Sequence, residues 1–288
     1  MEAARPFLPV PQPVAFTVFG LDIMWYAIML TSGMIAGVFL AYRRSLQYGI
    51  KQDTILDIAL YCVPAGIVGG RAYYVIFKWE HYKDDLLQIF NTRAGGMAIH
   101  GALIGAIGLG VILLRKWKIN VWDTLDLVAP AIALGQCIGR WGNYFNSEAH
   151  GGPCDKPWAI LADGELVHPT FLYESIWCGL LVLLLLLLEK KMGGRSRFGG
   201  QFFCIYAFLY SLERIYVESL RTDSLMIGPF RQAMVFSAVC MIAAAAGYLM
   251  LRKRALLQPA AVGTESNPEE AVQQAGEAFE EEPAKMTE

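Results

Sequence analysis

Long apolar runs separated by short polar connections make up most of the chain as far as residue 251. A helix that crosses the hydrocarbon core of a bilayer needs roughly 20 mostly apolar residues. The pattern therefore predicts an all-α integral membrane protein with seven transmembrane helices. The seven runs cover approximately residues 17–42, 54–77, 97–114, 121–139, 170–188, 201–220 and 230–251.

The composition agrees with this prediction, because 55% of the 288 residues are hydrophobic and only 17% are charged. The first run is rich in Tyr, Trp and Met and has no small-residue cleavage site behind a basic segment. We therefore expect it to stay as the first helix and not to be removed as a signal peptide. The six cysteines show no paired spacing, so neither a disulfide framework nor a zinc site is predicted. We predict no metal, no organic cofactor and no nucleic-acid partner.

Lysine and arginine residues concentrate in alternate connections, which predicts the orientation of the chain. They occur within 43–51, 115–118, 190–197 and 252–254. Because positively charged connections stay on the cytoplasmic side, we expect the N-terminus outside and the C-terminus in the cytoplasm. The predicted parts are an external segment at 1–16, a seven-helix membrane domain at 17–251, and a basic stop followed by a disordered acidic cytoplasmic tail at 252–288.

The helix predicted at 201–220 carries polar residues with a helical period. Tyr210, Arg214, Glu218 and Arg221 are spaced i, i+4, i+8 and i+11, which places all four on one face. An arginine or aspartate at the centre of a membrane helix costs about 2.5–3.5 kcal/mol. We therefore expect this face to line a bundle interior or a wet cavity and not to meet lipid.

Other costly residues gather at the outer ends of four more predicted helices, in the stretches "GGRAYY", "HGALIG", "GRWGNYFNSE" and "HPTFLYE". They are Arg71, His100, Arg140, Asn143, Asn146, Glu148, His168 and Glu174. Five predicted helices therefore place costly polar groups at one level of one leaflet. This coincidence favours a shared functional site over unrelated single residues.

Several glycines accompany these polar groups. We expect Arg140 to end the fourth helix, with Gly139 and Gly142 allowing the backbone to turn sharply beside a ligand. Small residues let membrane helices approach closely. Packing of this kind is expected for Gly66, Gly69 and Gly70 on the second helix and for Gly101 and Gly105 on the third.

Structural interpretations of the same residues stay open. Arg71 and Arg140 would serve as anchors at the headgroup level, as arginines at helix ends often do. Arg214 with Glu213 and Glu218 would form an ion pair that only fixes packing. His100 would be a hydrogen-bonded polar group between helices.

Arginines that converge with asparagines suit an anion, because the guanidinium group offers a rigid fork of donors that matches phosphate oxygens. In the outer leaflet the abundant phosphate belongs to phospholipids. Histidine is the side chain best suited to exchange a proton near neutral pH, so His100 is the candidate base. A phosphate clamp with a histidine base suggests transfer chemistry on a lipid headgroup.

The motifs "HGALIG" at 100–105, "GRWGNYFNSEAHG" at 139–151, "HPTFLYE" at 168–174 and "ERIYVESLR" at 213–221 resemble the prolipoprotein diacylglyceryl transferase family, as do "WYA" at 25–27 and "GGRAYY" at 69–74. The resemblance runs in order through residues 17–251 and implies seven membrane helices with the N-terminus outside. It also implies transfer of the diacylglyceryl group of phosphatidylglycerol to the lipobox cysteine thiol of a preprolipoprotein. A thioether forms, and glycerol phosphate is released. The protein would then be a multi-pass transferase of the bacterial cell membrane with its active site toward the outer leaflet.

The resemblance also implies roles for individual residues. His100 matches the family's essential histidine and would be the base for the thiol, while Arg140 and Arg214 match arginines that would hold the phosphate and stabilise charge on the departing group. The other matched positions are expected to bind the substrate or orient the arginines. They are Tyr26, Arg71, Asn143, Asn146, Glu148, Gly151, His168, Glu174, Tyr210, Glu218 and Arg221.

A membrane transporter or channel that uses the buried Arg, Glu and His groups as a substrate path is the alternative function. It would be expected to place its polar groups near the bilayer midplane, on interrupted helices in two matching halves, and the sequence shows neither feature. An intramembrane hydrolase would need a serine and histidine or an aspartate pair. Asp57 and Asp126 fall away from the arginines.

Overall fold

The computed structural model describes residues 6–91 and 95–257, so the predicted acidic tail lies outside the described residues apart from its first positions. The described part contains seven helices of 18 residues or more. They are α1 (Trp25–Arg44), α2 (Gln52–Phe77), α3 (Ile99–Lys116), α4 (Val121–Phe145), α5 (Thr170–Lys191), α6 (Gln201–Leu220) and α7 (Gln232–Leu257). Short 3-10 helices follow α1 and α2, namely η1 (Ser45–Tyr48), η2 (Trp79–His81) and η3 (Leu86–Phe90).

Six of the long helices are long and apolar enough to cross a membrane. The exception is α6, which carries Glu213, Arg214 and Glu218 within its 20 residues. The prediction of a helical integral membrane protein is confirmed at this level. The seventh span and the orientation of the termini stay predictions.

Three two-stranded antiparallel sheets lie in the connections. They pair β1 (Val14–Val18) with β2 (Leu21–Met24), β3 (Ile160–Ala162) with β4 (Glu165–Val167), and β5 (Met226–Ile227) with β6 (Phe230–Arg231). The first sheet corrects the prediction that a helix begins near residue 17. Phe19 and Gly20 both have positive φ, at 49° and 77°, as a two-residue hairpin turn requires, and α1 begins only at Trp25.

A second correction concerns the end of the fourth helix. We predicted that it ends at Arg140, but α4 continues to Phe145. Its last turns are held by aromatic packing, since the Trp141 ring lies 5.3 Å and the Tyr144 ring 5.0 Å from the ring of Phe171. The backbone therefore makes no sharp turn at Gly139 or Gly142.

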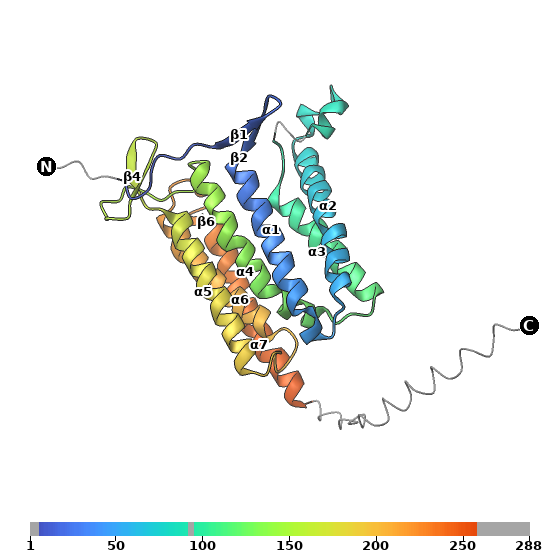
Figure 1. Ribbon diagram of the computed structural model, residues 1–288. Coiled ribbons are helices and arrows are strands. Elements are labelled where there is room, and N and C mark those ends of the chain that lie inside the picture. The colour runs from blue at the N-terminus through green and yellow to red at the C-terminus, as the bar shows by residue number, and fades with distance from the viewer. Residues whose placement is uncertain (1–5, 92–94, 258–288) are drawn as a thin grey trace, which may run out of the picture. The chain divides into compact units, whose positions relative to one another are not determined.

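Close helix packing at glycines was predicted correctly. A Cβ atom on Gly101 would lie 2.3 Å from the carbonyl oxygen of Gly69, and one on Gly105 would lie 2.4 Å from that of Ala65. On the other side of the bundle, a Cβ on Gly142 would lie 2.8 Å from Cδ2 of Tyr26. The glycines thus bring α3 against α2, and α4 against α1 (Figure 1).

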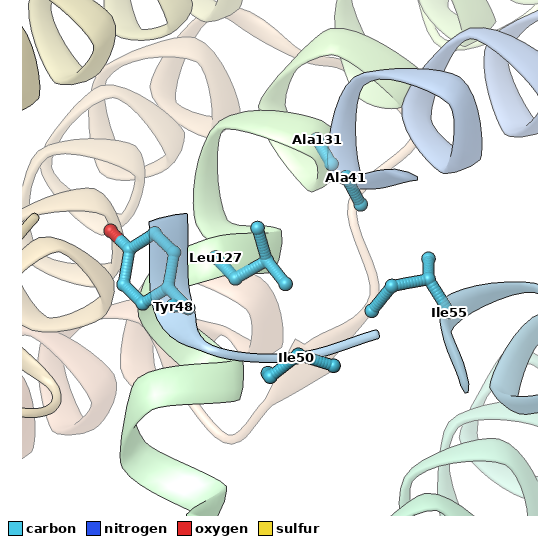
Figure 2. Close-up of a cluster of buried hydrophobic side chains, with 6 residues drawn as sticks. All are labelled: Ala41, Tyr48, Ile50, Ile55, Leu127 and Ala131. Atoms are coloured by element: carbon cyan, nitrogen blue, oxygen red, sulfur yellow. The ribbon is translucent and has the colours of Figure 1, made fainter. Parts of the chain in front are cut away.

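A buried apolar cluster closes the bundle at the end where α1 stops and α2 and α4 start. Figure 2 shows its members, which are Ala41, Tyr48, Ile50, Ile55, Leu127 and Ala131. Helix α4 also packs against α5 and α6, with Phe202 and Leu185 buried between them. Helix α4 is therefore the central element, because α1 packs along one of its sides while α5 and α6 pack along the other (Figure 1).

Candidate active site

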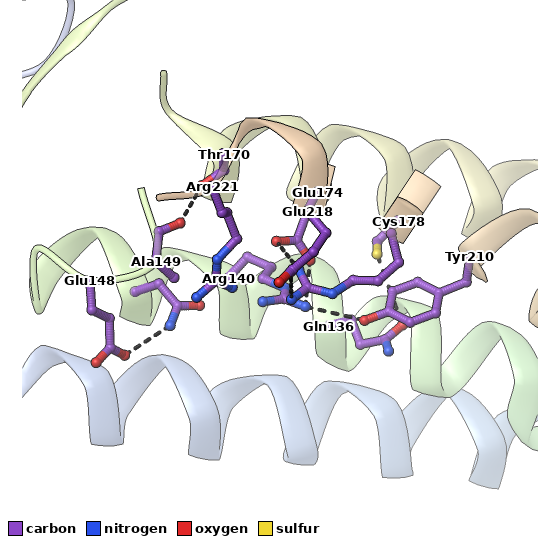
Figure 3. A network of polar contacts seen from close by, with 12 residues as sticks. Gln136, Arg140, Glu148, Ala149, Thr170, Glu174, Cys178, Tyr210, Glu218 and Arg221 are labelled. Atoms are coloured by element: carbon purple, nitrogen blue, oxygen red, sulfur yellow. Dashed lines mark hydrogen bonds and ion pairs between the residues drawn. The ribbon is translucent and has the colours of Figure 1, made fainter. Parts of the chain in front are cut away.

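One carboxylate joins three helices at the end of the bundle where α4 stops. Glu174, in the second turn of α5, is 1% exposed. Its Oε1 accepts a hydrogen bond from Nη1 of Arg214 on α6 at 3.0 Å, and its Oε2 forms an ion pair with Nη2 of Arg140 on α4. The two predicted arginines are therefore held side by side by a single acidic group. Figure 3 shows Arg140 and Glu174 among the polar contacts of this cluster.

The predicted face of α6 contributes two more partners. Nη2 of Arg140 donates to the hydroxyl oxygen of Tyr210 at 3.1 Å, and Nη2 of Arg214 donates to Oε2 of Glu218 at 2.7 Å. Both arginine side chains keep part of their surface open, 20% for Arg140 and 16% for Arg214. Arg140 is thus bound within the bundle, which argues against a role as a mere headgroup-level anchor.

An apolar cavity of about 670 Å³ reaches this cluster from the other side of α4. It lies among α1, α2, α3 and α4. Its polar lining comes mainly from Arg140, Asn143 and Gln136, with Tyr26 at the same end, and Val128 lies toward the opposite end. Arg140 lies 12 positions after Val128, which corresponds to about 18 Å of helix at roughly 1.5 Å per residue. The cavity is therefore long and apolar, with a cationic group at one end.

Four predicted residues lie in the connection after α4 or at its border. Nδ2 of Asn143 donates to Oε1 of Glu148 at 2.8 Å. Asn146 is the exposed C-cap residue of α4. Gly151 forms an antiparallel bridge with Arg221, and a Cβ on it would lie 2.7 Å from Cβ of His168. Gly151 therefore fastens this connection to the end of α6.

Two predicted residues turn to partners outside the arginine cluster. Arg221 donates from Nε and Nη2 to the two carboxylate oxygens of Asp223, at 2.9 and 2.8 Å. This hydrogen bonding to Arg221 lowers the pKa of Asp223 below its ordinary value. Nδ1 of His168 lies 3.1 Å from the hydroxyl of Tyr173. Both residues organise the connections around the site.

Arg71 has a structural role in this geometry. It is 7% exposed, and its guanidinium group donates five hydrogen bonds to backbone carbonyl oxygens. All five acceptors belong to the connection between α2 and α3, namely Gln88, Ile89, Asn91, Gly95 and Gly96. Arg71 therefore holds this connection in place, and a role in substrate binding stays a prediction.

His100 is not in contact with the arginine cluster. It is exposed in the first turn of α3, with its ring centroid 6.2 Å from that of Tyr73 on α2. Its neighbour Ile99 lines the cavity together with Leu103. The histidine is therefore at the border of the cavity, and its role as a base stays a prediction.

Comparison with known proteins decides the family. The family model described as prolipoprotein diacylglyceryl transferase matches residues 13–250. The chain belongs to this family. A protein of Clostridioides difficile named phosphatidylglycerol–prolipoprotein diacylglyceryl transferase is 47% identical over 242 residues, which are 84% of this chain and 96% of that protein. Proteins of the same name from Finegoldia magna (47%; 80% and 92% covered) and Bacillus cytotoxicus (45%; 79% and 88% covered) are also similar.

Sequence reasoning missed Gln136, although it lines the cavity beside Arg140. Its Oε1 accepts a hydrogen bond from the hydroxyl of Tyr206 on α6 at 2.8 Å. Gln136, Arg140 and Asn143 are spaced i, i+4 and i+7, so they lie on one face of α4. That spacing was the available signal. It was overlooked because α4 was expected to stop at Arg140.

Proposed function

We propose that this protein transfers the diacylglyceryl group of phosphatidylglycerol to the cysteine thiol of preprolipoproteins, the first step of lipoprotein maturation. The observation that carries the proposal is the long apolar cavity with Arg140 at one end. Acyl chains fit the apolar part, and an arginine fork fits the phosphate. Membership of the transferase family and the names of its relatives support the same reaction.

The phosphate of the lipid binds at Arg140 and Arg214 in this proposal. Both arginines already share Glu174, so an arriving phosphate competes with that carboxylate for the same donors. Tyr210 and Glu218 keep the two guanidinium groups oriented while this exchange takes place. Asn143, held by Glu148, supplies a further polar group at the cavity wall.

The chemical step forms a carbon–sulfur bond and breaks a carbon–oxygen bond. The thiol proton passes to a base, for which His100 is the candidate, since only the thiolate is a good nucleophile. The sulfur attacks the glyceryl carbon, and the bonding electrons leave with the phosphate oxygen as glycerol phosphate. Arg140 and Arg214 stabilise the negative charge that develops on this leaving group.

The proposal places the site toward the outer leaflet of the bacterial cell membrane. The basic residues in the last turns of α1, α3 and α5 support this orientation, and they lie at the opposite end of the bundle from Arg140. In this arrangement α6 is the seventh span, and its charged face is turned to Glu174 and not to lipid. Residues 17–251 form the membrane catalytic domain, and the lipobox cysteine arrives on a membrane-anchored signal peptide.

The test uses purified protein in detergent micelles with phosphatidylglycerol and a short lipobox peptide. Mass spectrometry detects the diacylglyceryl mass on cysteine, and a second assay measures released glycerol phosphate. Wild type is expected to make both products, while folded His100→Ala and Arg140→Ala variants do not. If wild type makes neither product where a related transferase does, the proposal is wrong, and flux assays in liposomes would test the transporter alternative.

A further inference from the structure

Gln136 is a polar residue of the cavity wall to which the proposed reaction gives no role. It precedes Arg140 by four positions on α4, which corresponds to about 6 Å of helix at roughly 1.5 Å per residue. The residues of α4 that line the cavity beyond it, as far as Val128, are apolar or glycine. Gln136 therefore lies where the polar end of the cavity gives way to the apolar part.

Side chains of α5 and α6 fix the carbonyl end of the Gln136 amide. Its Oε1 accepts hydrogen bonds from the hydroxyl of Tyr206 at 2.8 Å and from the thiol of Cys178 at 3.9 Å. Both partners are buried, and Figure 3 shows the contact with Cys178. Within the described part of the chain, the side-chain hydrogen bonds of Gln136 all involve Oε1. The two N–H donors of its Nε2 therefore remain available to a molecule in the cavity.

The other polar residues of the cavity wall lie nearer to its polar end. Arg140 and Asn143 follow Gln136 by four and seven positions on α4. Tyr26 packs at Gly142, where a Cβ would lie 2.8 Å from Cδ2 of the tyrosine. Gly142 follows Gln136 by six positions, or about 9 Å of helix. Among the described residues, Gln136 is therefore the one polar side chain of the wall at its own depth.

Space for a ligand lies between Gln136 and Arg140. Gly139 is the residue of α4 that lines the cavity between them, and a Cβ on it would meet no other helix within 4 Å. On the preceding turn, by contrast, α1 packs closely, since a Cβ on Gly33 would lie 2.8 Å from the carbonyl oxygen of Gly135. The backbone beside Gln136 is thus held by a helix contact, while the space at Gly139 is open.

A diacyl phospholipid has its own transition from polar to apolar at the two acyl esters. The esters follow the phosphate by a few bonds of the glyceryl group, and the acyl chains begin there. With the phosphate at Arg140 and the chains directed toward Val128, the esters come to the depth of Gln136. An ester carbonyl oxygen accepts a hydrogen bond and donates none, so it complements the N–H donors of Nε2. In apolar surroundings a donor left without an acceptor is unfavourable.

We propose that Gln136 determines specificity for ester-linked glycerophospholipids, because its Nε2 donates a hydrogen bond to an acyl ester carbonyl of the bound lipid. This inference rests on the proposed transferase function. The ester takes no part in the bonds that form and break, so the hydrogen bond is the same in the bound lipid and in the transition state. It therefore lowers KM and raises kcat/KM, with little effect on kcat.

The test offers the intact protein in micelles equal amounts of phosphatidylglycerol and its diether analogue, which has the same headgroup and chain lengths but no carbonyl groups. Both lipids react at the same glyceryl carbon, and their products on the lipobox peptide differ in mass. The product ratio measures the ratio of the two kcat/KM values. One hydrogen bond of ordinary strength predicts that wild type prefers the diester by about three- to tenfold.

Gln136→Leu combined with Tyr206→Phe removes the amide without leaving the tyrosine hydroxyl unpaired. This double variant is expected to bring the product ratio to within about twofold of one. The matched control is Gln201→Leu. Gln201 is also a buried glutamine whose Oε1 accepts a hydrogen bond, from the backbone N–H of Arg197, but it does not line the cavity. The control should keep the wild-type ratio.

The wild-type ratio decides first. A ratio near one would overturn this inference and leave the transferase function intact, and that outcome does not depend on the folding of any variant. A wild-type preference that persists in the folded, active double variant would also overturn it. If wild type modifies the peptide with neither lipid, the proposed function itself is contradicted.

Discussion

Arg44 and Glu189 lie 145 positions apart in the chain and form a buried two-point ion pair. Nε of Arg44 lies 2.9 Å from Oε2 of Glu189, and Nη2 lies 2.6 Å from Oε1. Tyr48 donates to the same carboxylate at 2.9 Å. The pair ties the end of α1 to the end of α5, at the opposite end of the bundle from Glu174.

Breaking this pair from one side should destabilise the protein strongly. Arg44→Met leaves the carboxylate of Glu189 buried without its cation, and the expected loss is about 3–5 kcal/mol. The double variant Arg44→Met with Glu189→Met should recover most of that loss. Thermal unfolding in detergent measures the effect, with the exposed neighbour Arg43→Met as the matched control. Equal melting temperatures for Arg44→Met and Arg43→Met would contradict the prediction.

The start of α6 depends on a side chain from α4. Oδ2 of Asp126 accepts from the backbone N–H of Gly200 and Oδ1 accepts from that of Phe203, each at 2.9 Å. Asp126→Ala removes this cap and is expected to cost about 0.5–2 kcal/mol, read from the midpoint of unfolding. Asp123, one turn earlier, pairs with the half-exposed Arg195. Asp123→Ala should lower stability by less than Asp126→Ala does. A larger loss for Asp123→Ala would count against the role of Asp126 as a cap.

Two glycines on α3 should respond to alanine in opposite ways. A Cβ on Gly105 would lie 2.4 Å from the carbonyl oxygen of Ala65, whereas Gly108 has nothing within 4 Å. Gly105→Ala should therefore push α2 and α3 apart and cost about 1–3 kcal/mol. Gly108→Ala should stabilise the protein by about 0.5–1 kcal/mol, because alanine is the better helix former. Unfolding curves of the two variants in one detergent decide between these signs.

Arg140→Lys tests whether two-point binding of the phosphate matters. Lysine keeps the charge but offers a single nitrogen in place of the planar fork, of which Nη2 contacts both Glu174 and Tyr210. Loss of a donor that stabilises developing charge lowers kcat on the order of a hundredfold, and a similar fall is expected here with an unchanged unfolding temperature. Near-normal turnover of purified Arg140→Lys would exclude the fork as the important feature.

Arg71→Lys separates a structural role from substrate binding. One ammonium group is unable to replace five guanidinium hydrogen bonds to the connection between α2 and α3. In the variant, chymotrypsin should then cut faster than in wild type at Trp79, Tyr82 or Phe90. Adding phosphatidylglycerol should not bring the cleavage rate of the variant down to that of wild type. Wild-type cleavage rates with a raised KM would instead place Arg71 in the binding site.

The parts predicted correctly from sequence are those that rest on local spacing. The helix period brought Tyr210, Arg214 and Glu218 to one face, and the structure places them together with Glu174 and Arg140. Close approach of α2 and α3 followed from glycine spacing. In both cases neighbouring positions on one helix carry the information.

What the sequence did not reveal depends on distant partners or on turn geometry. Arg44 was interpreted only as one of the positive charges that orient the chain, and nothing in its neighbourhood points to Glu189. The five acceptors of Arg71 are main-chain oxygens, which have no residue signature. The β1–β2 hairpin was missed because a hydropathy window averages over the turn at Phe19 and Gly20.

The cavity among α1, α2, α3 and α4 affects how much free energy it costs to move a lipid out of the bilayer and into the protein. Its walls are largely apolar from Val128 to the neighbourhood of Arg140, so acyl chains that enter it exchange one hydrocarbon environment for another. Moving a methylene group into water costs about 0.8 kcal/mol, and exposing two whole chains would cost on the order of tens of kcal/mol. A protein with this cavity never has to supply that free energy, and its few polar contacts remain available for the polar groups of the lipid alone.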